Sequence, residues 1–314
     1  MALDPADIRA VQDHFGFLRP APIEKDWYVV RALVAILSIN AAPFRLIFAG
    51  GTALARAHRL VDRMSEDVDF KIVSASPAPM SGNQQRNELG KLRDAVTSVL
   101  RAVGFVFDPS DSAHHRSRDQ NRYMVYDLPL NTEAGPELRP SIQIELTHTK
   151  LRQPTVMLPV QSFIAEAFGR APEIKNVECV SVTETAAEKL VALTRRIAME
   201  LAGVSRNPDP TLVRHLYDLH FIRSRIVPDE VAALARDIAA TDAVEFKNQY
   251  PAYHADIRGE TSKALAAIGN DPAFRENYAS FVQSMVYGAR PEFDAAFATV
   301  AELVEVFLRK PADI

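Results

Sequence analysis

Two glycines and a threonine, Gly50-Gly51-Thr52, stand between a short apolar run and a helical pattern in the first half of the chain. Adjacent glycines allow a sharp turn and let a ligand approach the main chain closely. The exposed N–H groups at the start of the following helix attract an anion, and the helix dipole adds to this attraction. With the hydroxyl of Thr52 as a further donor, the turn is expected to bind the triphosphate of a nucleotide.

Two aspartates follow the turn in a segment that alternates between apolar and charged residues. Asp67 and Asp69 are two positions apart in a predicted strand over residues 66–72, so both carboxylates project from one face. Mg²⁺ (or Mn²⁺) prefers hard oxygen ligands, commonly one or two carboxylates together with phosphates and waters. The pair therefore predicts a metal site that bridges protein and nucleotide. With two ions, one would activate the attacking oxygen and the other would stabilise the pyrophosphate leaving group.

A third carboxylate, Glu145, is expected to complete this arrangement. It lies in a second alternating segment, residues 141–147, in which Ile144 and Leu146 are expected to face the core. Glu145 shares the opposite face with Gln143. We predict that Glu145 holds the metal ion that activates the acceptor hydroxyl, or that it serves as the general base.

The second half of the chain supplies cations and a further carboxylate in helical patterns. Lys189 and Arg196 are seven residues apart and therefore share one helix face. Lys189 is placed to bind nucleotide phosphates as a point charge, and Arg196 to hold a further phosphate or the acceptor. Asp218 stands among apolar residues, where an unpaired carboxylate is costly. A salt bridge to Arg214 or to Lys189 would offset that cost.

Strand-like segments alternate with helical ones in the first part of the chain. The apolar run 46–49 has the length of a buried strand and stops at the two glycines. The polar stretch 109–121 predicts a mobile loop. Strands are expected at 46–49, 66–72, 105–107, 123–126 and 141–147, and helices at 24–39, 52–58 and 84–102.

After this mixed region nearly every pattern is helical. Ser181 and Glu184 form an S-x-x-E capping box, which predicts the start of a helix over residues 182–201. We therefore predict two domains, a mixed α/β domain over residues 1–180 and a helical domain over residues 181–314.

Composition restricts the classes of protein to consider. A single cysteine, Cys179, excludes an internal disulfide framework and any multi-thiolate metal site. The most apolar stretch, residues 32–37, is far shorter than the roughly 20 residues that span a bilayer, so we expect a soluble, cytoplasmic protein without a membrane segment. The net charge of −4 lacks the basic excess of proteins that coat long nucleic acids. A nucleic-acid partner would therefore need a local basic patch, for which residues 114–122 are a candidate, although His114 and His115 fit solvated side chains better than catalytic ones.

These motifs resemble those of a known family. The AbiEii/AbiGii-type toxins carry the pattern G-G-T-x-L followed by R-x-S-x-D-x-D-F. The matching residues here are Gly50, Gly51, Thr52, Leu54, Arg63, Ser65, Asp67, Asp69 and Phe70. These toxins belong to the nucleotidyltransferase-fold superfamily, together with the mycobacterial MenT toxins. The segments AEKLVALTRR at 187–196 and RHLYDLHF at 214–221 are similar to further family segments, so the resemblance runs from about residue 23 to 221.

The resemblance implies an α+β fold, with a nucleotidyltransferase-type mixed-sheet domain followed by an α-helical bundle. It implies that Lys189 and Asp218 belong to the active site. Arg63 and Ser65 precede the paired aspartates, and they either contact phosphate or order the loop. The implied activity is Mg²⁺-dependent transfer of a nucleoside monophosphate from an NTP to an acceptor hydroxyl, with the 3′ end of a tRNA as the acceptor. The protein would be the toxin of a toxin–antitoxin or phage-defence pair, with a cognate antitoxin as its partner.

Two alternatives remain open at the level of sequence. The same fold could transfer the nucleotide to a protein side chain or to a small molecule. It could also serve as a nucleotide-binding module without catalysis, but a pure binder has no need of three convergent carboxylates such as Asp67, Asp69 and Glu145.

Overall fold

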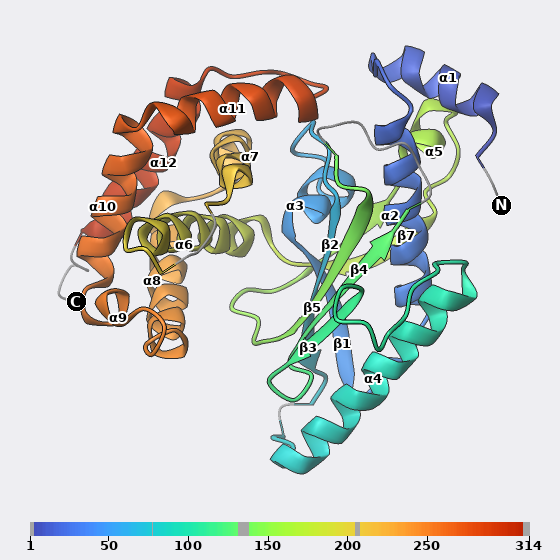
Figure 1. Cartoon of the computed structure of the whole chain (residues 1–314), viewed down its shortest axis with the longest axis horizontal. Coiled ribbons are helices and arrows are strands. Elements are labelled where there is room, and N and C mark those ends of the chain that lie inside the picture. The colour runs from blue at the N-terminus through green and yellow to red at the C-terminus, as the bar shows by residue number, and fades with distance from the viewer. Residues whose placement is uncertain (1–2, 77, 131–137, 205–207, 310–314) are drawn as a thin grey trace. The chain divides into compact units, whose positions relative to one another are not determined.

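Seven strands form one mixed sheet in the N-terminal part of the chain (Figure 1). The computed structural model describes residues 3–76, 78–130, 138–204 and 208–309. The strand order is β3-β4-β5-β2-β1-β7-β6, with β2–β5 and β1–β7 parallel and all other neighbours antiparallel. The predicted mixed-sheet fold class is confirmed. The strands are β1 (Phe44–Ala49), β2 (Asp67–Ser74), β3 (His115–Arg118), β4 (Tyr123–Pro129), β5 (Ser141–His148), β6 (Val156–Val160) and β7 (Ile174–Cys179).

The main core lies between one face of this sheet and two long helices, α2 (Ala21–Leu37) and α4 (Gly82–Ala102). In β2, Phe70 is buried in this core, and in β5 Ile144 is fully buried in it. Because side chains alternate along a strand, the polar residues between these core positions project from the other face. The sheet thereby holds the carboxylates of β2 and β5 on the face opposite the helices.

Four shorter segments complete this part of the chain. The helix predicted at 52–58 consists of one α-helical turn followed by a π-helical turn, in which the backbone N–H groups bond five residues back. His58 Nε2, just beyond that turn, lies 2.9 Å from the carbonyl of Val180. The segments are α1 (Pro5–Phe15), α3 (Gly50–Thr52), η1 (Ala53–Ala57) and α5 (Phe163–Ala167).

A buried ion pair ties α2 to η1 and α5. Arg56 Nε lies 2.6 Å from Asp26 Oδ1, and the backbone N–H of Phe163 donates to Asp26 Oδ2 at 2.7 Å. The guanidinium of Arg56 also stacks over the Phe163 ring, 3.4 Å from its centroid. Burial raises the pKa of Asp26 to about 6, although Arg56 and the Phe163 N–H oppose the shift.

The raised pKa of Asp26 predicts a specific dependence of stability on pH. Its ordinary value is 3.8, so between about pH 4 and pH 6 the folded chain binds a proton that the unfolded chain has lost. The stability of the wild type relative to Asp26→Asn should therefore fall as pH rises through this window, by on the order of 3 kcal/mol. Trp27, the only tryptophan, lies next to Asp26 and reports the unfolding by fluorescence in urea. The exposed Asp13 gives the control, Asp13→Asn; a stability difference for Asp26→Asn that does not change with pH would contradict the assignment.

Two sequence predictions in this part of the chain are wrong. Residues 105–107 were expected to form a strand, but they run as a loop in which Phe105 and Phe107 reach the core while Val106 is 82 % exposed. Their alternation reflects a loop lying on the core, with no partner strand. The polar stretch 109–121 was expected to be loop throughout, yet it contains β3, the edge strand that pairs with β4.

The chain divides into two compact units, Met1–Val180 and Ser181–Ile314. The second unit is helical in all its described elements. Its longest helix starts at Ser181, whose Oγ accepts from the backbone N–H of Glu184 at 3.2 Å, as the capping motif predicts. The segments are α6 (Val182–Leu201), η2 (Pro210–Val213), α7 (Arg214–Ile222), η3 (Arg223–Arg225), α8 (Pro228–Glu245), α9 (Pro251–Ala255), α10 (Ile257–Asn270), α11 (Pro272–Met285) and α12 (Phe293–Leu308).

Helix α6 is the centre of this second unit. It packs against α7, α8 and α10, while α12 packs against α7 and α8. The buried stripe of α6 includes Leu190, Leu193 and Ile197, the residues that its helical periodicity places on one face. Across the described parts of the chain, no helix has the length and apolar character needed to cross a bilayer.

Candidate active site

The turn after β1 requires glycine because of a side chain that lies against it. Gly50 has φ +74°, a conformation that residues with a Cβ rarely adopt. A Cβ added there would lie 1.8 Å from Asp69 Oδ2, and one added at Gly51 would lie 2.4 Å from Arg63 Nη2. Ala49 pairs with Asp69 in the ladder between β1 and β2, so the strand register delivers the carboxylate to the turn. The two glycines thus make room for the polar side chains of the site.

Strand register brings the three predicted carboxylates onto one face of the sheet. Asp69 of β2 is the direct neighbour of Glu145 in the parallel ladder with β5, and Asp67 is the neighbour of Gln143. All four side chains are partly buried. The three carboxylates thus lie at neighbouring positions on one face of the sheet, although Asp67 and Asp69 are 78 and 76 residues from Glu145 in the sequence.

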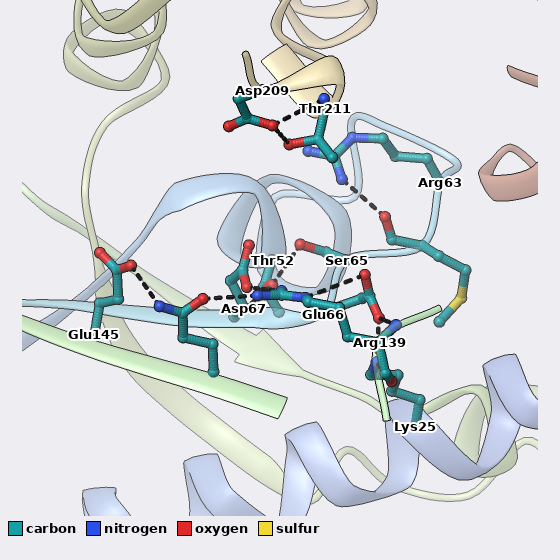
Figure 2. Close-up of polar contacts among 12 residues, drawn as sticks. Lys25, Thr52, Arg63, Ser65, Glu66, Asp67, Arg139, Glu145, Asp209 and Thr211 are labelled. Carbon is teal, nitrogen blue, oxygen red and sulfur yellow. Dashed lines mark hydrogen bonds and ion pairs between the residues drawn. The ribbon is translucent and has the colours of Figure 1, made fainter. Parts of the chain in front are cut away.

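Thr52, Arg63 and Ser65 form a hydrogen-bonded frame around the turn. The Oγ1 of Thr52 lies 2.7 Å from Ser65 Oγ and also contacts the main-chain carbonyl of Asp67 (Figure 2). Arg63 is 2 % exposed, and its Nη1 donates to the carbonyl of Met64 at 2.8 Å. The sequence left open whether Arg63 and Ser65 order the loop or contact phosphate. These contacts give both residues an ordering role in the structure.

A cluster of opposite charges that the sequence did not predict surrounds Asp67. Figure 2 shows contacts that run from Lys25 through Glu66 and Arg139 to Asp67. Arg139 Nη2 donates to Asp67 Oδ1, and its Nη1 donates to Gln143 Oε1 at 2.7 Å. The backbone N–H of Arg139 donates to Glu66 Oε1 at 2.8 Å. Burial lowers the pKa of Lys25, although its pairing with Glu66 opposes that shift.

Glu145 is held by two neighbours. Gln143 Nε2 donates to Glu145 Oε1 at 3.2 Å, and the hydroxyl of Tyr123 on β4 hydrogen bonds with the same carboxylate. Burial and, to a smaller extent, the neighbouring Glu145 together raise the pKa of Tyr123 to about 12, so the phenol is neutral at physiological pH. A neutral phenol beside a carboxylate donates its proton to that hydrogen bond and thereby orients Glu145.

The donor chemistry of this face suits a hard divalent cation, but the side chains are not gathered around one point. In the described residues, no three His, Cys, Asp or Glu side chains converge closely enough to hold a metal ion. Asp67 is turned toward the guanidinium of Arg139, and Glu145 toward Gln143 and Tyr123. Carboxylates on adjacent strand positions are nevertheless the ligands that Mg²⁺ and Mn²⁺ prefer.

The second unit contains the other predicted site residues. Lys189 Nζ lies 2.8 Å from Asp218 Oδ2; the lysine is 6 % exposed and the aspartate is fully buried. The contact with Lys189 is one of the two that the sequence left open for Asp218. Arg196 Nη2 lies 2.5 Å from Asp209 Oδ2, the carboxylate that also caps the first turn of η2. A further residue, His215, has a buried Nδ1 with no hydrogen-bond partner, and burial together with the charge of Lys189 lowers its pKa well below the usual range.

The histidines of residues 114–122 are more enclosed than expected. The ring of His115 lies 4.6 Å from that of Tyr126, and its Nε2 is buried without a hydrogen-bond partner. Burial lowers the pKa of His115, so its charge is disfavoured. His115 is therefore part of the packing at the sheet edge rather than a solvated side chain. The neighbouring residues Arg116 and Arg118 of β3 are exposed.

Comparisons with known proteins identify the family of the chain and a solved structure with a similar fold. The family model described as "Nucleotidyl transferase AbiEii toxin, Type IV TA system" matches residues 31–299. Among solved structures, the chain is similar to MenT4, a nucleotidyltransferase toxin from Mycobacterium tuberculosis H37Rv. The TM-score is 0.53 at 19 % sequence identity, and the match covers 99 % of this chain and 92 % of that chain. No match was found among curated protein sequences.

The family match covers both units of the chain and includes every predicted site residue, from Gly50 to Asp218. It supports a nucleotidyltransferase over the alternative of a binding module without catalysis. Membership of this family implies an NTP substrate and an antitoxin partner. The chain belongs to the AbiEii family of nucleotidyl transferase toxins of type IV toxin–antitoxin systems.

Proposed function

We propose that this nucleotidyltransferase moves a nucleoside monophosphate from an NTP to the 3′ end of a tRNA. The oxygen of the acceptor hydroxyl bonds to the α-phosphorus, and its proton passes to solvent or to Glu145 as general base. The bond between the α-phosphorus and the oxygen that bridges to the β-phosphate breaks, and pyrophosphate leaves. The observation that supports the transfer reaction is the β2–β5 register: Asp69, whose carboxylate lies against the Gly50 turn, is the neighbour of Glu145, and Asp67 is the neighbour of Gln143. The tRNA acceptor follows from the family resemblance. Such a face is suited to a polyphosphate held with a divalent cation.

In this proposal each site residue has a defined task. Asp67, Asp69 and Glu145 would hold Mg²⁺ or Mn²⁺, which when bound offsets the negative charge that develops on the phosphates. Gly50 and Gly51 let the phosphates approach the main chain. Thr52, Arg63 and Ser65 keep the turn in shape, as their contacts with one another and with the adjacent main chain indicate.

The helical unit would contribute the remaining charges. Lys189 would bind the nucleotide phosphates as a point charge, with Asp218 holding its ammonium group in position. Arg196 would bind a further phosphate or the acceptor. A cognate antitoxin would block this reaction, and the enzyme would act in the cytoplasm. The name of the similar protein MenT4 describes a nucleotidyltransferase toxin, which agrees with this assignment.

The proposal predicts that label from an α-³²P NTP will appear on tRNA. The protein is incubated with Mg²⁺, total tRNA and each of the four labelled NTPs in turn, and products are separated on a denaturing gel. Asp67→Asn/Asp69→Asn is the control, because it keeps the side-chain volumes and removes both charges. We expect label on tRNA with the wild type and none with the control.

The other outcomes of this labelling assay test the identity of the acceptor, the metal dependence and the site of addition. Label on a protein or on a small molecule, with none on tRNA, would contradict the tRNA acceptor and support a different substrate for the same chemistry. Equal transfer after removal of Mg²⁺ with EDTA would contradict the metal dependence. Removal of the terminal adenosine from the tRNA tests the site of addition, since transfer to an internal position would not depend on that nucleotide.

A further inference from the structure

The contact between Arg139 and Asp67 places a cation on the first carboxylate of the site. Arg139 Nη2 donates to Asp67 Oδ1 while Nη1 donates to Gln143 at 2.7 Å, so the guanidinium spans two side chains of neighbouring strands. A guanidinium and a divalent cation both require the lone pairs of a carboxylate. They therefore compete for the same oxygen of Asp67.

The position of Arg139 is fixed by its main chain. Its backbone N–H donates to Glu66 Oε1 at 2.8 Å, and its carbonyl accepts from Lys25 Nζ. Lys25 and Glu66 are 3 % and 8 % exposed and pair with each other. A long surface side chain would lose much rotamer freedom in such a contact, but here the buried pair anchors the residue and directs its guanidinium to Asp67. Four charged residues build the arrangement: Lys25 of α2, Glu66 just before β2, Asp67 of β2 and Arg139 before β5.

The guanidinium also connects Asp67 to the third carboxylate. Gln143, which accepts from Arg139, donates from Nε2 to Glu145 Oε1 at 3.2 Å. Because the amide of Gln143 joins both contacts, moving Arg139 away changes the surroundings of Asp67 and of Glu145 together. Arg139 thus contacts Asp67 directly and Glu145 through Gln143.

The phosphates of a bound nucleotide are a second anionic group with which Arg139 could pair. Phosphate oxygens accept two parallel N–H bonds from a guanidinium, a pairing at least as favourable as the single contact with Asp67. We propose that Arg139 couples the binding of the divalent cation to that of the nucleotide, by holding Asp67 until a triphosphate takes over the guanidinium. This inference rests on the proposed function of Asp67 as a metal ligand. It makes Arg139 a positioning residue that prevents tight binding of the cation alone.

The test measures Mn²⁺ binding directly by the EPR signal of the free ion. Wild type and Arg139→Gln are titrated with Mn²⁺ alone and with Mn²⁺ plus the α,β-methylene analogues of ATP, CTP, GTP and UTP. Glutamine keeps hydrogen-bond donors at this position and removes the charge. We expect Arg139→Gln to bind Mn²⁺ alone about tenfold more tightly than the wild type, and the analogue to tighten Mn²⁺ binding strongly only in the wild type.

The matched control is Arg122→Gln. Arg122 precedes β4 in the same unit and donates to Gln85 at 2.8 Å, so this variant makes the same change in net charge without contacting Asp67. Its Mn²⁺ binding should equal that of the wild type. Arg139→Lys is the second variant, for use if Arg139→Gln does not fold: it keeps a counter-charge for Glu66 but cannot bridge Asp67 and Gln143, and we expect severalfold tighter Mn²⁺ binding than the wild type.

The outcomes separate this inference from the function on which it rests. If the wild type binds Mn²⁺ with a nucleotide analogue but the Arg139 variants bind Mn²⁺ alone no more tightly than the wild type, the coupling is refuted and the metal site stands. If the wild type binds no Mn²⁺ with any analogue, the proposed metal dependence fails, and the coupling fails with it. A purely structural role for Arg139 would lower the melting temperature without changing the ratio of the two Mn²⁺ affinities.

Discussion

Gly50→Ala is expected to lower the rate of nucleotidyl transfer about 100-fold while the protein remains folded, because misplacing a reacting group by about 1 Å has effects of this size. The added Cβ would lie 1.8 Å from Asp69 Oδ2, so either Asp69 or the turn must move. Asp69 is a proposed metal ligand and the turn is the proposed phosphate site, so either movement should slow the transfer. Initial rates of pyrophosphate release in the presence of total tRNA, the proposed acceptor, measure the effect.

Gly16→Ala separates this clash from backbone strain. Gly16 has φ +73°, nearly the same as the +74° of Gly50, but an added Cβ would meet nothing within 4 Å. Both variants should lose about 1 kcal/mol of stability from the left-handed conformation. Only Gly50→Ala should lose activity. Wild-type rates in Gly50→Ala would show that the position of Asp69 against the turn is unimportant for transfer.

Local sequence patterns were sufficient to predict the elements that carry the site residues, namely β2, β5 and the start of α6. The alternation around Asp67 and around Glu145 gave β2 and β5 to within two residues, because one face of each strand is buried and the other is polar. The capping motif at Ser181 gave the start of α6, since it satisfies N–H groups within a single turn. In each case the determining contacts lie within a few residues.

Edge strands and irregular core segments were not predictable in this way. The strand β3 (His115–Arg118) is short, polar and mostly exposed, so it lacks the alternation that identified β2. Conversely, Phe105 and Phe107 alternate with an exposed residue but have no partner strand. Whether an extended segment becomes a strand depends on a neighbour that is distant in sequence.

The charge cluster around Asp67 was likewise not predictable from local sequence, because its members are far apart in the chain. Lys25 contacts Glu66, 41 residues away, and Arg139, 114 residues away, and no local pattern relates them. One signal was available: Lys25 stands in the buried stretch of α2 near Ile23 and Val29, where a charged side chain requires a partner. The sequence indicates that such a partner exists, but only the fold identifies it.

Asp218→Asn is expected to destabilise the helical unit by about 3–5 kcal/mol, because it removes the carboxylate charge that faces the buried ammonium of Lys189 at 2.8 Å. The double variant Lys189→Met/Asp218→Leu removes both charges and should recover most of this loss, since well-packed apolar residues replace such pairs at little cost. Urea unfolding followed by circular dichroism at 222 nm measures both effects. Asp242→Asn is the matched control. Its partner Arg195 lies on α6, as Lys189 does, and Arg195 Nε is 2.9 Å from Asp242 Oδ2. Because this pair is partly exposed, a loss of about 1 kcal/mol is expected.

Activity of the double variant then distinguishes a structural pair from a catalytic one. A stable Lys189→Met/Asp218→Leu protein that transfers nucleotide at the wild-type rate would show that the pair serves packing alone. If Lys189 binds the nucleotide phosphates, the same stable protein should lose about 100-fold in kcat/KM for the NTP, the effect of removing a charge-assisted contact of about 3 kcal/mol. Recovery of stability without recovery of activity is the result we expect, because apolar replacements restore the packing of α6 against α7 but supply no charge for a phosphate.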